Sequence, residues 1–301
     1  MMKKNVSYIT TPIYYVNDQP HIGHAYTTIA ADVLARYHRL HGNDVFFLTG
    51  TDEHGTKVAE SAEAAGMTPK EFADKVSGQF RSAFQELTIQ FDKFIRTTDE
   101  EHKRQVLVFM EKLKTEGALY EGEYEGLYCT GCEEFKTEKE LVDGKCSMHP
   151  QPIERVKEKN WFFRLTQYLP RVEKLIESGG LEILPHTRRE EVLGLFKQEL
   201  TDFSVSRSTV KWGIPFPGDE EQTIYVWVEA LQNYITAIGY AEDRSMFEKY
   251  WPNVTHLIGK EILKFHAVFW PAMLLAAGEE PPKRIIVNGH FQLNGKKMSK
   301  S

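Results

Sequence analysis

Val6-Ser7-Tyr8-Ile9-Thr10-Thr11 and, shortly after it, His21-Ile22-Gly23-His24 are the stretches from which the fold of this chain is inferred. The first is rich in β-branched and aromatic residues, which favours a β-strand, and Pro12 limits its further pairing. The second opens a segment whose apolar residues recur every three or four positions, as they do in an α-helix: Ile29, Val33, Tyr37 and Leu40. A strand followed by a helix predicts a βα unit.

The same alternation continues along the chain and returns near its end. Val45-Phe46-Phe47-Leu48 is a short apolar run typical of a buried parallel strand, and Thr68-Pro69-Lys70-Glu71 is a helix capping box with proline at the first helical position. Strands are predicted over 255–259 and 284–288, with a helix over 260–277 between them. This alternation predicts an α/β fold built on a parallel sheet.

The middle of the chain has a different character. From Gly117 to about Lys159 it is rich in Glu, Lys, Gly, Tyr and Cys and has few long apolar patterns. A sheet that begins, is interrupted and resumes predicts one α/β domain with an inserted module. We expect the first half of that domain in residues 1–116, the insertion in 117–222 and the second half in 223–301.

The composition narrows the class of protein. The chain has 301 residues, 41% hydrophobic and 27% charged, as in ordinary globular proteins. No apolar run approaches the roughly 20 residues that span a bilayer, and three cysteines are too few for a secreted disulfide scaffold. The net charge of −6 argues against a nonspecific nucleic-acid coat. Lys3 and Lys4 are not followed by the apolar core of a signal peptide, so a cytoplasmic protein without a membrane anchor is expected.

Cysteine and histidine spacing in the insertion predicts a metal site. Cys129-x-x-Cys132 and Cys146-x-x-His149 are separated by thirteen residues and use all three cysteines of the chain. Two such pairs supply the four nitrogen and sulfur ligands of a tetrahedral zinc ion, and four protein ligands leave no open position for chemistry. We expect one structural zinc; the alternative is three reduced thiols beside a surface histidine.

Two short motifs indicate phosphate binding. His21 and His24 flank Gly23 at the start of the first helix, where unpaired N–H groups and the helix dipole favour an anion. Lys297-Met298-Ser299-Lys300-Ser301 follows the last predicted strand and could neutralise a polyphosphate. Alone, the first motif is equally compatible with a capped helix start that carries two surface histidines, and the second is better explained as a solvated basic turn.

As a pair, however, these motifs are the signature of the class I aminoacyl-tRNA synthetases, and the sequence resembles the methionine-specific family among them over nearly its whole length. Further residues carry the resemblance: Pro12-Ile13-Tyr14-Tyr15-Val16-Asn17, Thr49-Gly50-Thr51-Asp52-Glu53-His54-Gly55, Tyr225-Val226-Trp227, Ile258-Gly259-Lys260-Glu261-Ile262, Phe265-His266, Phe269-Trp270-Pro271-Ala272-Met273 and Val287-Asn288-Gly289-His290. The resemblance implies a Rossmann-like sheet with a zinc-bearing connective insertion.

It also implies roles for individual residues. Catalysis is expected from His21, His24, Lys297 and Lys300, and ATP binding from these four with Gly23, Asn288, Gly289 and His290. Asp52 follows the second strand, where it could cap the next helix, pair with the substrate ammonium, or do both, and the resemblance favours ammonium binding. The other residues of the implied methionine site are Ile13, Tyr15, Trp227, Ala230, Leu231, Tyr234, Ile262, His266 and Trp270. From spacing alone, the last three form a helical stripe, which is more typical of core packing than of a pocket, with the two nearly balanced for Trp270.

The function that follows is activation of L-methionine by ATP, with Mg²⁺ on the phosphates, and transfer of the methionyl group to the 3′ end of tRNA(Met). Family members continue into a helical anticodon-binding domain that these 301 residues do not contain, so weak adenylation and poor tRNA charging are expected. Two other classes stay open: a nucleotidyltransferase of related fold, which would not bind methionine, and a noncatalytic RNA-binding module, which the acidic composition disfavours.

Overall fold

The structure of the chain is a computed structural model that describes residues 5–132, 134–136, 138, 141–146, 153–289, 292–293 and 296–297. Among these residues, no helix has both the length and the apolar composition needed to cross a membrane.

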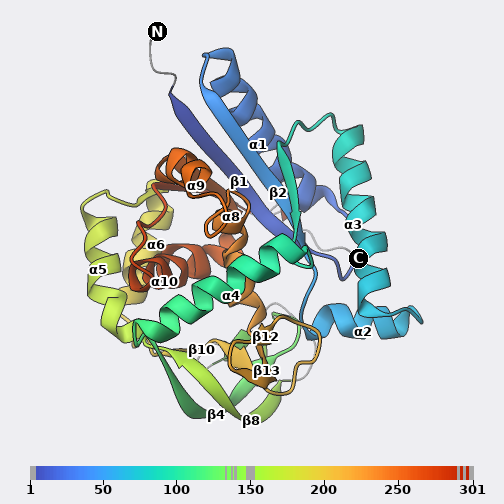
Figure 1. Cartoon of the computed structure of the whole chain (residues 1–301), viewed down its shortest axis with the longest axis vertical. Helices are drawn as coiled ribbons and strands as arrows, with labels where there is room; N and C mark the ends of the chain where they lie inside the picture. Colours follow the sequence, from blue (N-terminus) through green and yellow to red (C-terminus); the bar gives the residue numbers. More distant parts are fainter. Residues whose placement is uncertain are drawn as a thin grey trace.

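A six-stranded parallel sheet forms the centre of the molecule and confirms the predicted α/β class. Its strand order is β3-β2-β1-β14-β15-β9, and every neighbouring pair is parallel. The strands are β1 (Val6–Tyr15), β2 (Asp44–Asp52), β3 (Lys93–Arg96), β9 (Glu182–Leu184), β14 (Val254–Gly259) and β15 (Arg284–Asn288). β1 thus lies between strands from opposite ends of the chain, which packs the two halves of the expected domain together (Figure 1).

Alternate residues of the central strands point into two separate cores. Ile9 and Phe47 pack against helices α1 (Ile22–Leu40) and α3 (Pro69–Glu86). Tyr8 and Leu48 pack on the opposite face, and the helices in that core are α4 (Glu100–Thr115), α5 (Leu165–Glu177), α6 (His186–Phe196), α7 (Val226–Leu231), α8 (Asn233–Thr236), α9 (Arg244–Tyr250) and α10 (Trp270–Ala276). α2 (Thr56–Ala64) follows β2 directly. The helices lie on both faces of the sheet (Figure 1).

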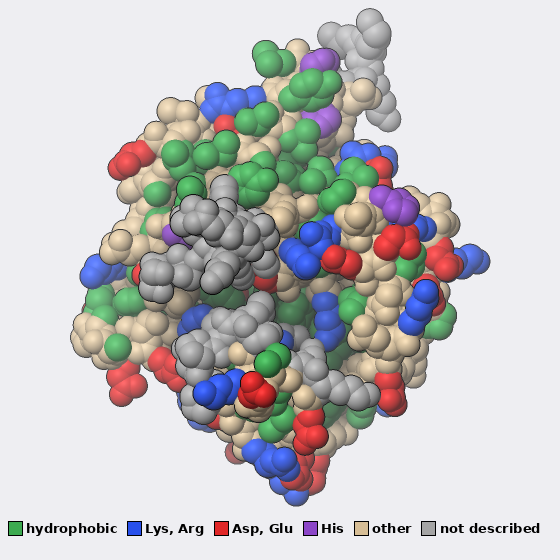
Figure 2. Space-filling view, turned by 180° about the vertical axis from the view of Figure 1, so that it is seen from behind, with side chains coloured by type: hydrophobic (Ala, Val, Ile, Leu, Met, Phe, Trp, Pro, Cys, Tyr) green, Lys and Arg blue, Asp and Glu red, His purple; other side chains and the backbone are tan. Residues whose placement is uncertain are grey.

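Helix α1 is where the sequence predicts it, but its apolar repeat faces outward. The face turned to the sheet is small and includes Ala31 and Ala35, which lets the helix lie close to the strands. An exposed stripe runs along the other face: Ile22 54%, Tyr26 43%, Ile29 42%, Val33 60%, Tyr37 55% and Leu40 86%. Hydrophobic side chains accordingly follow the helix on the surface seen in Figure 2.

The middle of the chain leaves the central sheet and builds smaller antiparallel sheets. One has the order β10-β8-β4-β5 and the other β11-β13-β12. Their strands are β4 (Leu119–Cys129), β5 (Glu134–Lys136), β8 (Glu154–Phe163), β10 (Phe203–Ser204), β11 (Ser206–Arg207), β12 (Pro215–Phe216) and β13 (Asp219–Ile224), beside a short β6 (Leu141–Val142) and β7 (Lys145–Cys146) pair. Strand β9 lies within the range predicted for the insertion, 117–222, yet pairs with β15 at the edge of the central sheet.

The predicted regular helix over 260–277 is interrupted, which is a correction to the sequence-based expectation. Lys260–Ile262 is a 3₁₀ turn and Phe265–Phe269 a π-helical turn in which the Trp270 N–H donates to the Phe265 carbonyl five residues earlier. α10 begins only at Trp270. Pro271 has no N–H to continue the usual pattern, and a widened turn before it is the physical result.

Candidate functional site

The start of helix α1 is built as a pair of histidine donors. His21 is the N-cap, and its Nδ1 accepts from the Gly23 N–H at 3.1 Å, while His24 Nδ1 accepts from the His21 N–H at 3.3 Å. Since each Nδ1 is an acceptor, the proton of each neutral ring resides on Nε2. The two rings stack with centroids 3.7 Å apart. This reciprocal cap fixes both side chains at the helix N-terminus, which is where proteins commonly bind anions.

The position of this helix start in the sheet is that of a ligand site. β1 has β2 on one side and β14 on the other, so the chain reverses its direction of travel across the sheet at β1. Open α/β sheets bind ligands outside the carboxyl ends of the strands at such a point. Asn288, at the carboxyl end of β15, donates from Nδ2 to Thr27 Oγ1 of α1 at 2.7 Å. The predicted nucleotide residue Asn288 and the helix of His21 and His24 are therefore neighbours.

The other predicted phosphate residues are only partly within the described residues. Gly289 is exposed directly after β15. Lys297 belongs to β17 (Lys296–Lys297), which pairs with β16 (Gln292–Leu293), and this backbone pairing is all that the structure describes there. His290 and Lys300 lie outside the described residues. The expected role of Lys300 in binding ATP together with His24 stays a prediction.

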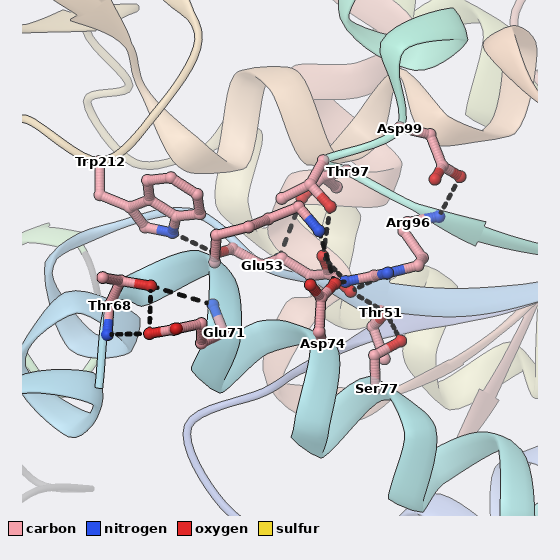
Figure 3. A network of polar contacts seen from close by, with 12 residues as sticks. Thr51, Glu53, Thr68, Glu71, Asp74, Ser77, Arg96, Thr97, Asp99 and Trp212 are labelled. Atoms are coloured by element: carbon pink, nitrogen blue, oxygen red, sulfur yellow. Dashed lines mark hydrogen bonds and ion pairs between the residues drawn. The ribbon is translucent and has the colours of Figure 1, made fainter. Parts of the chain in front are cut away.

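Asp52 ends β2 and begins a loop, Asp52–Gly55, that a polar network holds in place (Figure 3). Within the network, Glu53 is fully buried and accepts from Arg96 Nε at 2.7 Å and Arg96 Nη2 at 2.8 Å. Thr51 Oγ1 and Thr98 Oγ1 also donate to its carboxylate, and Thr97 Oγ1 accepts from its backbone N–H at 2.9 Å. Buried carboxylates need such partners, so these contacts make the backbone beside Asp52 rigid.

The insertion clamps the same loop from the other side. Trp212 Nε1 donates to the Glu53 carbonyl at 2.5 Å, and the Gly55 N–H donates to the Trp212 carbonyl at 3.0 Å. Gly55 has a φ of 99°, which glycine adopts without strain, and it is the N-cap of α2. Asp52 does not cap that helix, so of its two expected roles the pairing with an ammonium group remains.

The predicted methionine residues gather at the same end of the sheet. Tyr15, the last residue of β1, pairs in register with Asp52, and its ring meets that of Trp227 at a centroid distance of 6.3 Å. Tyr234 lies 2.7 Å from His266, between its hydroxyl and Nε2. Ala230, Leu231 and Trp270 are buried in α7 and α10, while Ile13 and Ile262 are half-buried. The structure thus brings together an aromatic, largely apolar set beside one carboxylate.

Sequence reasoning missed several residues of this region. Phe265 stacks on Trp227 with centroids 4.1 Å apart, and Arg96, Trp212 and Glu229 hold the Asp52–Gly55 loop. The run of acidic and imidazole side chains from Asp52 to His54 at the end of a buried strand was an available signal for Glu53 and His54. Their partners come from distant segments, which no local pattern indicates.

Buried histidines in this region are held neutral. Burial lowers the pKa of His266 from its ordinary value of 6.5 to about 4 and that of His102 to about 3, and it places the pKa of His256 well below 6.5. His266 Nδ1 lies 2.9 Å from the Ile262 carbonyl and donates to it, so Nε2 accepts from the Tyr234 hydroxyl. Each ring therefore resists protonation as long as the protein is folded.

This predicts acid-sensitive stability. Between pH 6.5 and about 4 the unfolded chain binds a proton at His266 that the folded protein does not. The contribution of His266 to the free energy of unfolding is therefore fully present above pH 6.5 and is lost as the pH falls toward 4. His266→Gln should remove about 1.4 kcal/mol of this loss per pH unit. Urea unfolding of both proteins at pH 7, 6 and 5 measures it, and parallel pH dependences would contradict the prediction.

The three cysteines converge on one point, as the spacing predicts. The sulfurs of Cys129, Cys132 and Cys146 all lie within 4.8 Å of one another, with 3.5 Å between Cys132 and Cys146. Sulfurs around a tetrahedral zinc stand about 3.8 Å apart, given Zn–S bonds of about 2.3 Å. Three converging thiols therefore fit a thiolate-preferring metal ion. His149, the predicted fourth ligand, lies outside the described residues.

This cluster contacts Trp227, one of the predicted methionine residues, directly. Trp227 Nε1 donates to the Cys132 carbonyl at 3.3 Å, and Lys57 Nζ of α2 donates to the Gly131 carbonyl at 3.1 Å. The turn between the first two cysteines thus contacts both α7 and the helix that follows the Asp52–Gly55 loop. Its backbone helps to place the Trp227 ring.

A parallel sheet whose switch point carries a histidine pair at a helix start, beside a carboxylate and an aromatic set, is the arrangement of α/β proteins of the Rossmann type. A family model described as tRNA synthetases class I (M) matches residues 7–152 and 136–301. The chain belongs to this family of class I tRNA synthetases.

Individual relatives agree with the family assignment. The methionine--tRNA ligases of Caldanaerobacter subterraneus subsp. tengcongensis and Thermotoga maritima are each 50% identical, over 99% and 98% of this chain and 47% of their own length. A structure of Mycobacterium tuberculosis methionyl-tRNA synthetase in complex with methionyl-adenylate is 42% identical with a TM-score of 0.94, covering 98% of this chain and 59% of that one. The chain spans about half the length of the curated relatives it matches.

Proposed function

We propose that this protein activates L-methionine with ATP, giving methionyl-adenylate and pyrophosphate, and passes the methionyl group to the 3′ adenosine of tRNA(Met). The observation that carries the proposal is the placement of the histidine pair of α1 and the aromatic set around Asp52 at one end of a single parallel sheet. The similarity to methionine--tRNA ligases supports the same activity. Activation of an amino acid for translation corresponds to a cytoplasmic location.

In the first step the methionine carboxylate oxygen attacks the α-phosphorus of ATP, and the bond from that phosphorus to the β-phosphate oxygen breaks. Pyrophosphate leaves with the electron pair. Such a displacement needs positioning and charge stabilisation more than covalent help. His21 and His24 donate from Nε2 to phosphate oxygens, and Lys297 and Lys300 stabilise charge on the departing pyrophosphate. Mg²⁺ accompanies the phosphates, and Gly23, Asn288, Gly289 and His290 border the nucleotide.

Methionine is bound by charge at one end and by apolar contact at the other. Asp52 pairs with the ammonium group. The thioether, which is flexible and only a weak acceptor, suits the rings of Tyr15, Trp227, Tyr234 and His266 with few polar groups nearby. The rest of the proposed site consists of Ile13, Ala230, Leu231, Ile262 and Trp270.

The insertion carries the proposed zinc. Cys129, Cys132, Cys146 and His149 would hold one ion with all four positions filled, which makes its role structural. The contact of the Cys132 carbonyl with Trp227 would transmit its ordering effect to the amino-acid site. We keep the proposed division of the chain at 117 and 222, with β9 returning to the central sheet.

Methionine-dependent exchange of labelled pyrophosphate into ATP tests the first step. The proposal expects exchange with L-methionine and none with leucine or without an amino acid. A nucleotidyltransferase would be favoured instead if pyrophosphate exchange had the same rate with and without methionine. Calorimetry that shows ATP binding but no methionine binding would favour it as well. Salt-dependent RNA binding with no ATP turnover would favour the RNA-binding alternative.

Lys300→Ala is expected to slow adenylate formation far more than it weakens methionine binding. The reason is that this ammonium would act on charge that develops as pyrophosphate departs, and not on the amino acid. Single-turnover formation of methionyl-adenylate gives the rate, and calorimetry gives the methionine affinity. A change in affinity alone would refute the role of Lys300.

Removing metal from the cysteine cluster is expected to weaken methionine binding. Without the ion, the turn from Cys129 to Cys132 loses its shared anchor, and Trp227 loses a fixed acceptor at the Cys132 carbonyl. Chelation followed by methionine titration, with zinc added back as the control, measures the effect. An unchanged methionine affinity in verified metal-free protein would contradict the link.

A further inference from the structure

One buried pair ties the loop of Asp52 to a helix of the proposed methionine pocket. His54 Nδ1 lies 2.8 Å from Glu229 Oε1, and the two side chains are 5% and 0% exposed. Glu229 belongs to α7, the short helix that also carries Trp227, Ala230 and Leu231. A single contact thus connects the element that would bind the substrate ammonium with the element that would bind its side chain.

The side chains of this pair are almost completely shielded from solvent. His54 and Trp212 line a cavity of about 10 Å³, which has room for one water at most. The Trp212 ring meets the His54 ring edge-on, with centroids 5.2 Å apart. In such a medium a hydrogen bond to a carboxylate is strong, and leaving its partner unpaired is costly.

The second carboxylate oxygen of Glu229 points toward another buried histidine, His102 of α4. Glu229 Oε2 faces His102 Nε2 at 3.9 Å, and within the described residues neither atom has a hydrogen-bond partner. His102 Nδ1 lies 2.8 Å from Thr236 Oγ1, and Thr236 belongs to α8 together with Tyr234. The row from His54 through Glu229 and His102 to Thr236 therefore spans the loop, α7, α4 and α8.

We infer that Glu229 is a positioning residue for amino-acid binding. By accepting a hydrogen bond from His54, Glu229 holds the Asp52–Gly55 loop at a fixed distance from α7. The distance between the ammonium site and the side-chain pocket then matches the length of one substrate. Glu53 and Trp212 fix the loop to the rest of the molecule, whereas Glu229 fixes it to the pocket. The inference rests on the proposed function.

Glu229→Gln tests it, because glutamine keeps the size of the side chain and removes its charge. In methionine-dependent ATP–pyrophosphate exchange, the KM for methionine is expected to rise about tenfold or more, since a charge-assisted hydrogen bond is lost. The KM for ATP should change less than about twofold. Active-site titration gives the folded fraction, so a defect confined to folding would lower the number of active sites and leave both KM values unchanged.

A double-mutant cycle isolates the pair. His54→Ala should raise the KM for methionine in the same way, and adding Glu229→Gln to it should cause little further change, because the contact is already lost. His54→Gln, which retains an N–H donor, should recover part of the affinity. Glu279→Gln is the matched control: its side chain is 9% exposed and paired with Arg244 at 3.0 Å, and among the described residues its ion pairs, with Arg244 and Lys112, involve neither the loop nor α7.

Each result decides one question. Wild-type KM values in Glu229→Gln, or fully additive effects of the two substitutions, would overturn the positioning role. If Glu229→Gln does not fold, His54→Ala and His54→Gln decide it by the same KM comparison. Absence of exchange in the unaltered protein would instead refute the proposed function.

Discussion

Replacing His24 with alanine is expected to lower methionine-dependent ATP–pyrophosphate exchange by about two to three orders of magnitude, the usual cost of losing one preorganised donor to a reacting charge. His24 is prepared for this role before any ligand arrives. Its Nδ1 accepts from the His21 N–H, which leaves the ring proton on Nε2 and aims the ring from the first turn of α1. The loss should therefore appear in the rate of adenylate formation.

Two controls separate this effect from damage to the helix. His38→Ala removes a histidine from the other end of the same helix and should leave exchange within about twofold of the unaltered protein. Calorimetry should show that His24→Ala still binds methionine. Exchange at near-normal rate in His24→Ala would remove the histidine pair from the proposed mechanism.

The largest effect on stability is expected from Arg96→Met. Glu53 is fully buried, and Arg96 supplies both of the charged contacts to it, at 2.7 and 2.8 Å. Removing the guanidinium leaves an uncompensated buried carboxylate, which costs about 3–5 kcal/mol of unfolding free energy. The same change should abolish detectable methionine binding, because Asp52 precedes Glu53 directly in the loop.

Urea unfolding measures this cost against a matched pair. Arg39→Met breaks a surface contact with Asp92 at 2.6 Å, whose side chains are 29% and 38% exposed, and should cost less than about 1 kcal/mol. Adding Glu53→Gln to Arg96→Met should recover part of the lost stability, since the buried charge is then removed. Equal losses in the two arginine variants would contradict the assignment of the network as buried and charged.

The sequence predicts the central fold well because buried parallel strands appear in it as short runs of apolar residues. Val45 to Leu48 and Arg284 to Asn288 are read correctly for this reason. Strand β9 was not predicted: three residues are too few for a pattern, and only its pairing with β15 defines it. The π turn before Pro271 and the outward face of α1 also depend on tertiary packing, which local periodicity does not report.

The candidate site divides in the same way. The sequence predicts the positions of His21, Gly23 and His24 because the helix cap involves only neighbouring residues. It predicts the clustering of the three cysteines because their spacing along the chain is short. The position of Asp52 at the end of a strand could be predicted, and its binding role stays a prediction. The partners that fix its loop, Arg96, Trp212 and Glu229, are 44 to 177 positions away from it along the chain. Such contacts join segments that are distant along the chain, so they can be identified only in the folded structure.

The strand order has a consequence for how the protein is made. Tyr8 of β1 pairs with Val254, 246 positions later, so the ribosome must synthesise all the residues between them before this edge of β1 can pair. At about 5–20 residues per second, this takes about 12–50 seconds. During that interval one edge of β1 lacks its partner strand, and the rate of translation sets how long this edge stays open to pairing with another chain.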